Sequence, residues 1–98
     1  MDGKVTASSY GRGDREIREM LLHIVRSLVN HPDDVKIVIL SEQESSIFCM
    51  QTHPEDLNEL IGTDGQTARA LQIILGASGM KLGRRMTLDV VHESSRLQ

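Results

Sequence analysis

The sequence predicts a small α+β domain in which three helices cover one face of a three-stranded mixed sheet, in the order αββααβ. Three observations predict it: a helical apolar stripe near the start, two short apolar runs separated by a polar turn, and an alternating apolar run near the end. A chain of 98 residues has the size of one domain. We expect residues 14–92 to form it, with residues 1–13 a disordered tail and residues 93–98 a frayed end.

The first predicted helix begins at Asp14, a residue type suited to the N-cap, and ends before His31 and Pro32. Its apolar residues recur at positions i, i+3, i+4 and i+7, which is typical of a helix with one buried stripe. They are Ile17, Met20, Leu21, Ile24, Val25, Leu28 and Val29. Leu22 falls on the opposite face with Arg15, Arg18 and Arg26. We therefore expect Leu22 to be exposed, either as a scattered surface leucine or as a partner contact.

Residues 35–40 and 46–52 are predicted to form a hairpin around a polar turn, and residues 86–91 a third strand. The second strand has the most continuous apolar run, which favours a central position. Two predicted helices connect it to the third strand. These two strands can therefore lie side by side and parallel, with a right-handed crossover.

The two helices of this connection meet at a pair of glycines, Gly62 and Gly65. The first opens at Pro54, with acidic residues in its first turn, and is expected to present Leu57, Leu60 and Ile61 to the core. The second begins near Gln66. Its expected inward row is Ala70, Leu71, Ile74, Leu75 and Ser78, and residues 79–85 are expected to form a basic loop.

Composition excludes several classes of protein. A single cysteine, Cys49, forms no intrachain disulfide or thiolate cluster, and we expect it to be a buried thiol. No apolar run suits a membrane span or a secretory signal, so we expect a cytoplasmic protein with no membrane contact. Aromatic residues make up only 2% of the chain, Tyr10 and Phe48. Any site for RNA would therefore use backbone, aliphatic surface and cations.

The net charge of −3 is unevenly distributed along the chain. Residues 31–60 carry seven acidic residues against Lys36 alone. Residues 61–85 carry Arg69, Lys81, Arg84 and Arg85 against Asp64 alone. A partner with phosphate groups would be expected to meet the second stretch.

The segment Gly62-Thr63-Asp64-Gly65 has the pattern GxxG between two helices. Glycines allow the backbone to approach a ligand closely, and the following helix offers unpaired N–H groups and its positive dipole end to a phosphate. Taken alone, such a turn is more often a plain helix–helix connection. Here it lies between paired helices in the order αββααβ.

The stretch from His53 to Gly62, with Gln66-Thr67-Ala68-Arg69-Ala70-Leu71, resembles the bacterial single-KH-domain RNA-binding proteins (KhpA-like). The resemblance runs from about Glu16 to His92. It implies a type II KH domain that binds about four nucleotides of single-stranded RNA in the cytoplasm, as an RNA chaperone, without a cofactor. It also implies a homodimer, or a heterodimer with a larger KH-containing protein.

The resemblance assigns roles to particular residues. Ile61 and Leu71 would supply apolar floor, residues 62–65 the phosphate clamp, and Thr67 and Ala68 the near face of the helix. The residues implied to contact RNA are Ile61, Gly62, Thr63, Asp64, Gly65, Gln66, Thr67, Ala68, Arg69, Leu71, Lys81, Arg84 and Arg85.

The chain departs from the family pattern inside the loop. Relatives commonly carry Lys after the first glycine and a basic residue after the second, where this chain has Thr63 and Gln66. The Asp64 carboxylate beside a phosphate would cost about 1 kcal/mol, or about tenfold in affinity. Asp64 could instead cap the next helix. Weak binding of RNA with low sequence specificity is therefore expected, and the alternative is a degenerate KH domain that serves as a dimerisation module.

An enzyme or a metal site is not expected. His23, His31, His53 and His92 are scattered along the sequence and none has metal-ligand spacing with Asp, Glu or Cys. No nucleophile elbow or P-loop is present, so no small-molecule substrate is predicted. If the protein associates with a partner, Leu22 or the unpaired edge of the last strand is the expected contact.

Overall fold

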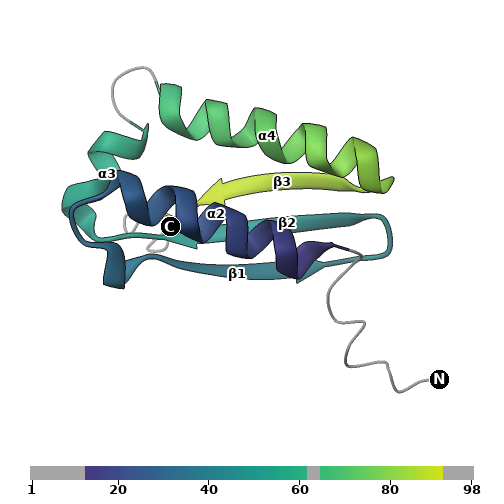
Figure 1. The fold of residues 1–98 in the computed structure, drawn as a ribbon, viewed down its shortest axis with the longest axis horizontal. Coiled ribbons are helices and arrows are strands. Elements are labelled where there is room, and N and C mark those ends of the chain that lie inside the picture. The colour runs from purple at the N-terminus through teal and green to yellow at the C-terminus, as the bar shows by residue number, and fades with distance from the viewer. Residues whose placement is uncertain (1–12, 62–64, 92–98) are drawn as a thin grey trace.

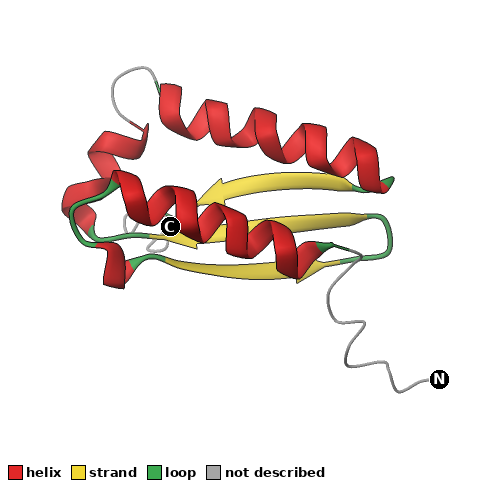
Figure 2. Cartoon of the chain, in the orientation of Figure 1, coloured by secondary structure: helices red, strands yellow, loops and turns green. Residues whose placement is uncertain are grey.

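The computed structural model describes residues 13–61 and 65–91. Three α-helices lie on one side of a three-stranded sheet (Figures 1 and 2). In chain order the elements are α2 (Asp14–Leu28), η1 (Pro32–Asp34), β1 (Lys36–Ser41), β2 (Ser45–Gln51), α3 (Pro54–Ile61), α4 (Gln66–Leu82) and β3 (Arg85–Val90). The predicted order αββααβ is confirmed, with one short 3-10 turn added before β1.

The sheet has the order β1-β2-β3, which confirms β2 as the central strand. β1 and β2 are antiparallel, with Ile39 opposite Phe48, while β2 and β3 are parallel, with Phe48 beside Leu88. The three strands lie one residue away from their predicted ranges. The crossover from β2 to β3 contains α3 and α4, as predicted.

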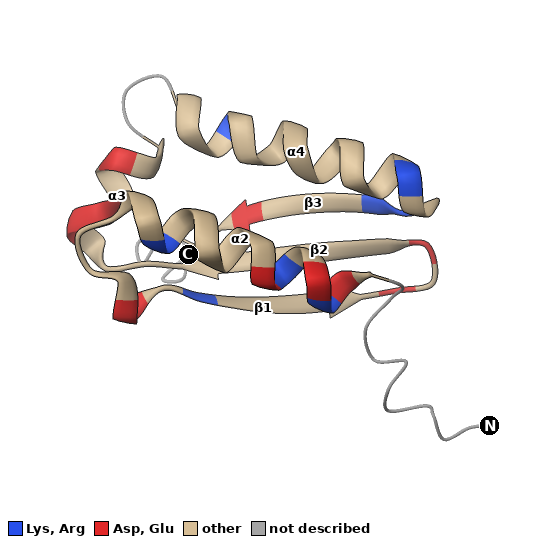
Figure 3. Ribbon diagram, in the orientation of Figure 1, with Lys and Arg blue, Asp and Glu red and all other residues tan. Residues whose placement is uncertain are grey.

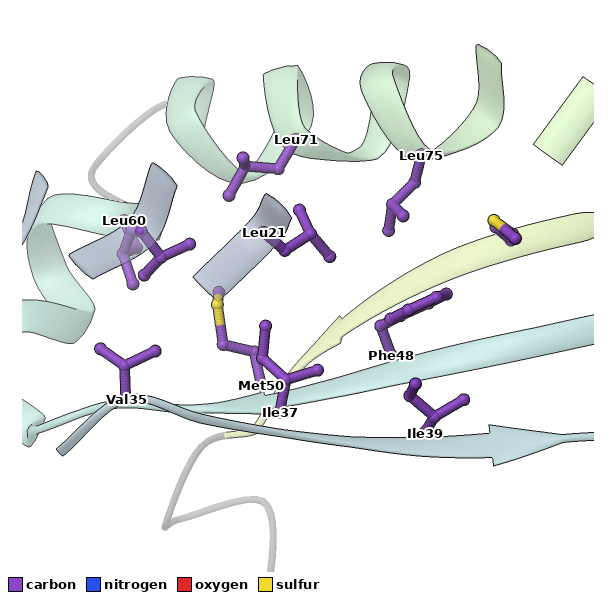
Figure 4. Packing of buried hydrophobic residues seen from close by; sticks show 11 residues of the cluster. Leu21, Val35, Ile37, Ile39, Phe48, Met50, Leu60, Leu71 and Leu75 are labelled. Atoms are coloured by element: carbon purple, nitrogen blue, oxygen red, sulfur yellow. The ribbon is translucent and has the colours of Figure 1, made fainter. Parts of the chain in front are cut away.

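The core lies between the sheet and the helices. Alternate strand residues such as Ile37, Phe48 and Met86 point toward the helices, because successive side chains in a strand face opposite sides. Figure 4 shows Leu21, Leu60, Leu71 and Leu75 packing onto this face. The buried apolar residues are Leu21, Val25, Val35, Ile37, Ile39, Phe48, Met50, Leu60, Leu71, Leu75 and Met86.

The start of α2 differs from the prediction. Gly13 is the N-cap residue, with φ of 76°, and Asp14 is the first helical residue. The Asp14 side chain is buried and accepts a hydrogen bond from Ser46 Oγ at 2.7 Å. Asp14 was expected to cap its own helix, but its carboxylate joins α2 to β2 instead.

Leu22 is not the exposed residue that the helical wheel predicted. It is half-buried and packs against the core, because α2 is covered on a broader face than one narrow stripe. Leu28, expected in the buried stripe, is 52% exposed. Leu22 is therefore a poor candidate for a partner contact.

Helix α4 is longer than predicted. Residues 79–82 continue the helix instead of starting a loop, and Gly83, with φ of 72°, ends it in the left-handed conformation. Gly79 is buried against β3: a Cβ there would overlap the carbonyl oxygen of Arg84 and lie 3.2 Å from the Met86 nitrogen. Two residues expected to face inward, Ala70 and Ile74, are exposed.

Within the described ranges, no helix is long and apolar enough to cross a membrane.

Candidate nucleic-acid interface

The junction of α3 and α4 carries the predicted binding loop. Helix α3 ends at Ile61 and α4 begins at Gln66, with Gly65 as its N-cap residue. Gly62, Thr63 and Asp64 lie outside the described residues, so the predicted clamp is described only at its last position. Gly65 has φ of 63°, and a Cβ on it would lie 3.2 Å from the Ile61 carbonyl oxygen. This backbone conformation favours glycine.

The first turn of α4 has three N–H groups without a partner within the helix, those of Gln66, Thr67 and Ala68. Among the described residues, the helical hydrogen bonding of α4 starts with the Arg69 amide, which donates to the Gly65 carbonyl at 2.9 Å. Gly65 provides no side-chain cap. Gly65 is the N-cap residue, and the suggested capping of α4 by Asp64 falls on a residue outside the described ranges.

The side chains around this turn differ in accessibility. Gln66 and Arg69 are exposed, and Ile61, Thr67 and Ala68 are half-buried. Leu71 was expected to form part of the apolar floor of the RNA site. It is only 3% exposed and belongs to the core, so it lies below the surface of that site. A ligand at this turn would contact backbone, short side chains and one arginine.

The predicted basic loop lies at the other end of α4. Lys81 is 16 residues beyond Gly65, which corresponds to about 24 Å along a helix. Lys81 lines a groove against the start of α2, with Glu16 and Ile17. Figure 3 shows basic residues near both ends of α4, with the uncharged middle of the helix between them. The fold therefore does not bring Lys81 and Arg85 to the glycine turn.

Arg84 is held inside this distal end of the domain. Its guanidinium donates to the Gln43, Glu42 and Ser45 carbonyls at 2.9 to 3.0 Å and to Ser46 Oγ at 2.8 Å. Its Nε lies 3.8 Å from Asp14 Oδ1, and its side chain is 10% exposed. These contacts give Arg84 a structural role, whereas Arg85 is exposed.

Gln72 was not predicted to matter, yet it connects α4 to the edge of the sheet. Its Nε2 donates to the Met86 carbonyl at 3.2 Å, and its Oε1 accepts from the Leu88 N–H at 2.8 Å. No local pattern in the sequence signals this role, because both contacts depend on where β3 lies beside α4.

Two of the histidines that are distant in the sequence are adjacent in the fold. The His31 and His53 rings stack at 3.8 Å with an interplanar angle of 11°. With Glu55 they place possible metal-ligand atoms within 4.8 Å of one another. However, the stacked rings have nearly parallel planes, so their in-plane lone pairs do not converge on one point. His53 Nδ1 already accepts from the Glu55 N–H at 3.0 Å.

A buried carboxylate holds this histidine pair to the rest of the domain. Asp56 accepts hydrogen bonds from the amides of Asn30 and His31 at 3.0 and 2.9 Å, and lies 3.1 Å from His31 Nδ1. Burial of the carboxyl group opposes ionisation, but these hydrogen bonds outweigh it and lower the pKa of Asp56. The cluster ties the loop after α2 to the start of α3.

Cys49 lies on the sheet face opposite the helices and is half-buried there, not within the core as expected. Partial burial, and next the charge of Asp89 beside it on β3, raise the pKa of the thiol. A thiol in this state is a weak nucleophile.

A family model described as "KhpA/KhpB, KH domain" matches residues 18–90, which extend from α2 to the last residue of β3. The chain belongs to the KhpA/KhpB family of KH domains. The match covers all the helices and strands from the second turn of α2 onward, and the resemblance found in the sequence is confirmed.

Curated relatives of this KhpA/KhpB-type domain agree with the assignment. The RNA-binding protein KhpA of Leifsonia xyli is 40% identical over 73 residues, which cover 74% of this chain and 93% of that protein. The RNA-binding protein KhpA of Streptomyces coelicolor is 37% identical, over 76% of this chain and 91% of its own. The Bacillus subtilis protein of the same name is 26% identical, over 79% and 95%. None of these three names describes an enzyme. No solved structure gives a significant match.

Proposed function

We propose that this KH domain binds short single-stranded RNA at the Gly62 to Gly65 loop and the first turn of α4, weakly and with low sequence specificity. The observation that supports the proposal most is the start of α4. A glycine in the left-handed conformation there precedes three N–H groups that lack helical partners. A phosphate of the RNA backbone would accept hydrogen bonds from these groups. The relatives named as RNA-binding proteins support the same choice of ligand.

Weak binding follows from the residues around the turn. Arg69 is the described cation nearest to the turn in sequence, and it lies on the exposed first turn of α4. Phe48 is fully buried, so it cannot stack on a base. Asp64 adds a negative charge to the loop itself. Binding therefore rests on backbone and a single arginine, which do not distinguish one base from another. Such a protein would act in the cytoplasm, where its RNA partners are found.

A charge change in the loop tests the proposal. Fluorescence anisotropy with a labelled random-sequence octanucleotide RNA at low salt should show weak binding by the wild type and about tenfold tighter binding by Asp64→Lys. Asp33→Lys is the matched control, because it makes the same charge change on the exposed turn η1. Replacing Thr63 and Asp64 together by Glu should abolish binding. No binding by the wild type or by Asp64→Lys would refute the proposal.

We propose self-association as a second function, and one observation favours it. Ile73 and Met80 are 66% and 83% exposed, and they lie seven residues apart on the same face of α4. A second copy of the chain would cover this face, in place of the earlier candidate Leu22. Light scattering after size exclusion should show a dimer for the wild type and a monomer for Ile73→Glu. Leu28→Glu, at an exposed leucine of α2, should leave the dimer intact. A monomeric wild type would contradict this proposal without affecting the first.

A further inference from the structure

The outer edge of β3 offers backbone hydrogen-bonding groups to a ligand. The amides of Arg85 and Val91 donate toward the β2 side, at 2.9 and 2.8 Å. Because backbone groups alternate sides along a strand, the N–H and C=O groups of Met86, Leu88 and Val90 point away from the sheet. Within the described part of the chain, no strand pairs with this edge.

Gln72 occupies one segment of that edge. Its side-chain amide donates to the Met86 carbonyl at 3.2 Å and accepts from the Leu88 N–H at 2.8 Å. These are the two groups that a neighbouring peptide unit would bind if another strand were present. Gln72 therefore satisfies the first half of the edge from within the domain. The Leu88 carbonyl and the Val90 N–H, nearer the glycine turn, receive no bond from it.

The chemistry of an amide is also that of a nucleobase edge. A primary amide presents one donor and one acceptor side by side. The Watson–Crick edge of every base does the same: an amino or imino N–H lies next to a ring nitrogen or a carbonyl oxygen. A base from a single-stranded RNA could therefore make the same two bonds to Met86 and Leu88, and Gln72 competes with it for both.

The place of Gln72 relative to the glycine turn fits this competition. Gln72 is seven residues beyond Gly65, or about 10 Å along α4. At about 3.4 Å per stacked nucleotide, this is about three nucleotides from the phosphate at the turn. Beyond Gln72, a groove of about 740 Å³ between α4 and β3 is lined by Gly76, Met86 and Thr87, and also by Ile73 and Met80 of the face proposed for self-association. A strand of RNA that follows α4 would thus meet Gln72 before it reaches the groove.

We infer that Gln72 mimics a base at the β3 edge, limits the RNA site to the glycine-turn half of α4, and lowers affinity for longer RNA. The inference rests on the proposed RNA-binding function. It gives the weak binding a second cause besides Asp64.

The variant Gln72→Ala removes both hydrogen bonds to β3 and leaves the Met86 carbonyl and the Leu88 N–H accessible to a ligand. Its affinity for a random-sequence hexanucleotide should rise about tenfold in fluorescence anisotropy, since one hydrogen-bonded base contact is gained. Its affinity for a trinucleotide should not change. Gln72→Met, which frees the edge but keeps the bulk, should gain less. Gln51→Ala removes a half-buried glutamine of β2 and is the matched control.

A second measurement reads the edge directly. In nitrogen-15 NMR spectra, hexanucleotide RNA should shift the Leu88 amide resonance strongly in Gln72→Ala and weakly in the wild type. Equal affinities and equal Leu88 shifts in the two proteins would overturn the inference while leaving RNA binding at the turn intact. Self-association of Gln72→Ala through β3 without an RNA gain would also overturn it, because Gln72 would then only protect the edge. RNA binding by neither protein would contradict the proposed function itself.

Discussion

Three buried polar side chains, Asp14, Ser46 and Asp56, join segments that are far apart in the sequence. Asp14 and Ser46 connect α2 to β2, and Asp56 connects α3 to the loop after α2. Buried polar groups are tolerated when they are hydrogen-bonded, and removing one partner is costly because it leaves the other unsatisfied. At the scale of single residues, stability therefore depends on a few polar contacts at the ends of the helices.

The buried carboxylate of Asp56 makes the stability of the fold depend on pH. Its pKa is lower in the folded than in the unfolded state, so its contribution is present above about pH 4 and is lost as pH falls through the folded pKa. Asp56→Asn should lower the Tm by several degrees at pH 7, and the difference from wild type should shrink at pH 3. Thermal unfolding followed by circular dichroism at both pH values measures this. Asp33→Asn, at an exposed aspartate of η1, should unfold like wild type. If Asp56→Asn lowered the Tm equally at both pH values, the ionised form of Asp56 would not be the source of its stabilising effect.

Arg84 should matter for folding and Arg85 should not. Arg84→Ala removes the bonds to the hairpin carbonyls and the ion pair with the buried Asp14 carboxylate, at a cost of about 3 kcal/mol. Arg85→Ala, at the exposed neighbour, should change stability by less than about 0.5 kcal/mol. Urea unfolding measures both. Similar losses for the two variants would contradict the structural role of Arg84.

At the scale of elements, the length of α4 depends on how closely it approaches β3. Glycines usually weaken a helix, and Gly76, Gly79 and Gly83 made residues 79–85 resemble a loop in the sequence. Gly79 is helical because only a residue without a Cβ lets α4 lie against Arg84 and Met86. A contact between two elements thus overrides the local helix propensity, and no local pattern could have predicted it.

Two glycines of this one helix should respond in opposite ways to alanine. Gly79→Ala should destabilise the domain by about 2 kcal/mol, because the new Cβ overlaps the Arg84 carbonyl. Gly76→Ala meets no atom within 4 Å and should stabilise by about 0.5 to 1 kcal/mol through helix propensity. Urea midpoints of the two variants test the pair. If both variants were stabilised, the claim that α4 and β3 approach too closely at Gly79 to admit a Cβ would be contradicted.

At the scale of the whole molecule, the fold could be predicted from the sequence much better than the site. The apolar periods of α2, β1 and β3 and the crossover through two helices depend on patterns that the sequence displays directly. The site depends on which residues converge in space. Nothing in the sequence shows that Arg84 is buried whereas its neighbour Arg85 is exposed. The distance from Lys81 to Gly65 depends on α4 being one continuous helix. The contacts of Gln72 likewise require the position of β3.

The charge pattern of the whole domain predicts a shallow dependence of RNA binding on salt. With the basic end of α4 distant from the turn, we expect about two phosphate contacts, from the α4 N-terminus and Arg69. For a single strand the affinity should then fall about sevenfold between 50 and 200 mM salt. Anisotropy titrations at both concentrations measure the slope. A much steeper loss would mean that Lys81 and Arg85 bind RNA as well.

The parallel pairing of β2 with β3 has a consequence for the order of folding. Ser41 and Ser46 pair across a short turn, whereas Ser45 and Arg85 pair although they are about 40 residues apart in the sequence. Closing the longer loop costs about 2 kcal/mol more chain entropy, so the hairpin should form early and β3 should dock late. When Arg84 arrives, the hairpin carbonyls that it binds are already in place. The turn between β1 and β2 would therefore offer a preformed binding site for Arg84 when β3 docks.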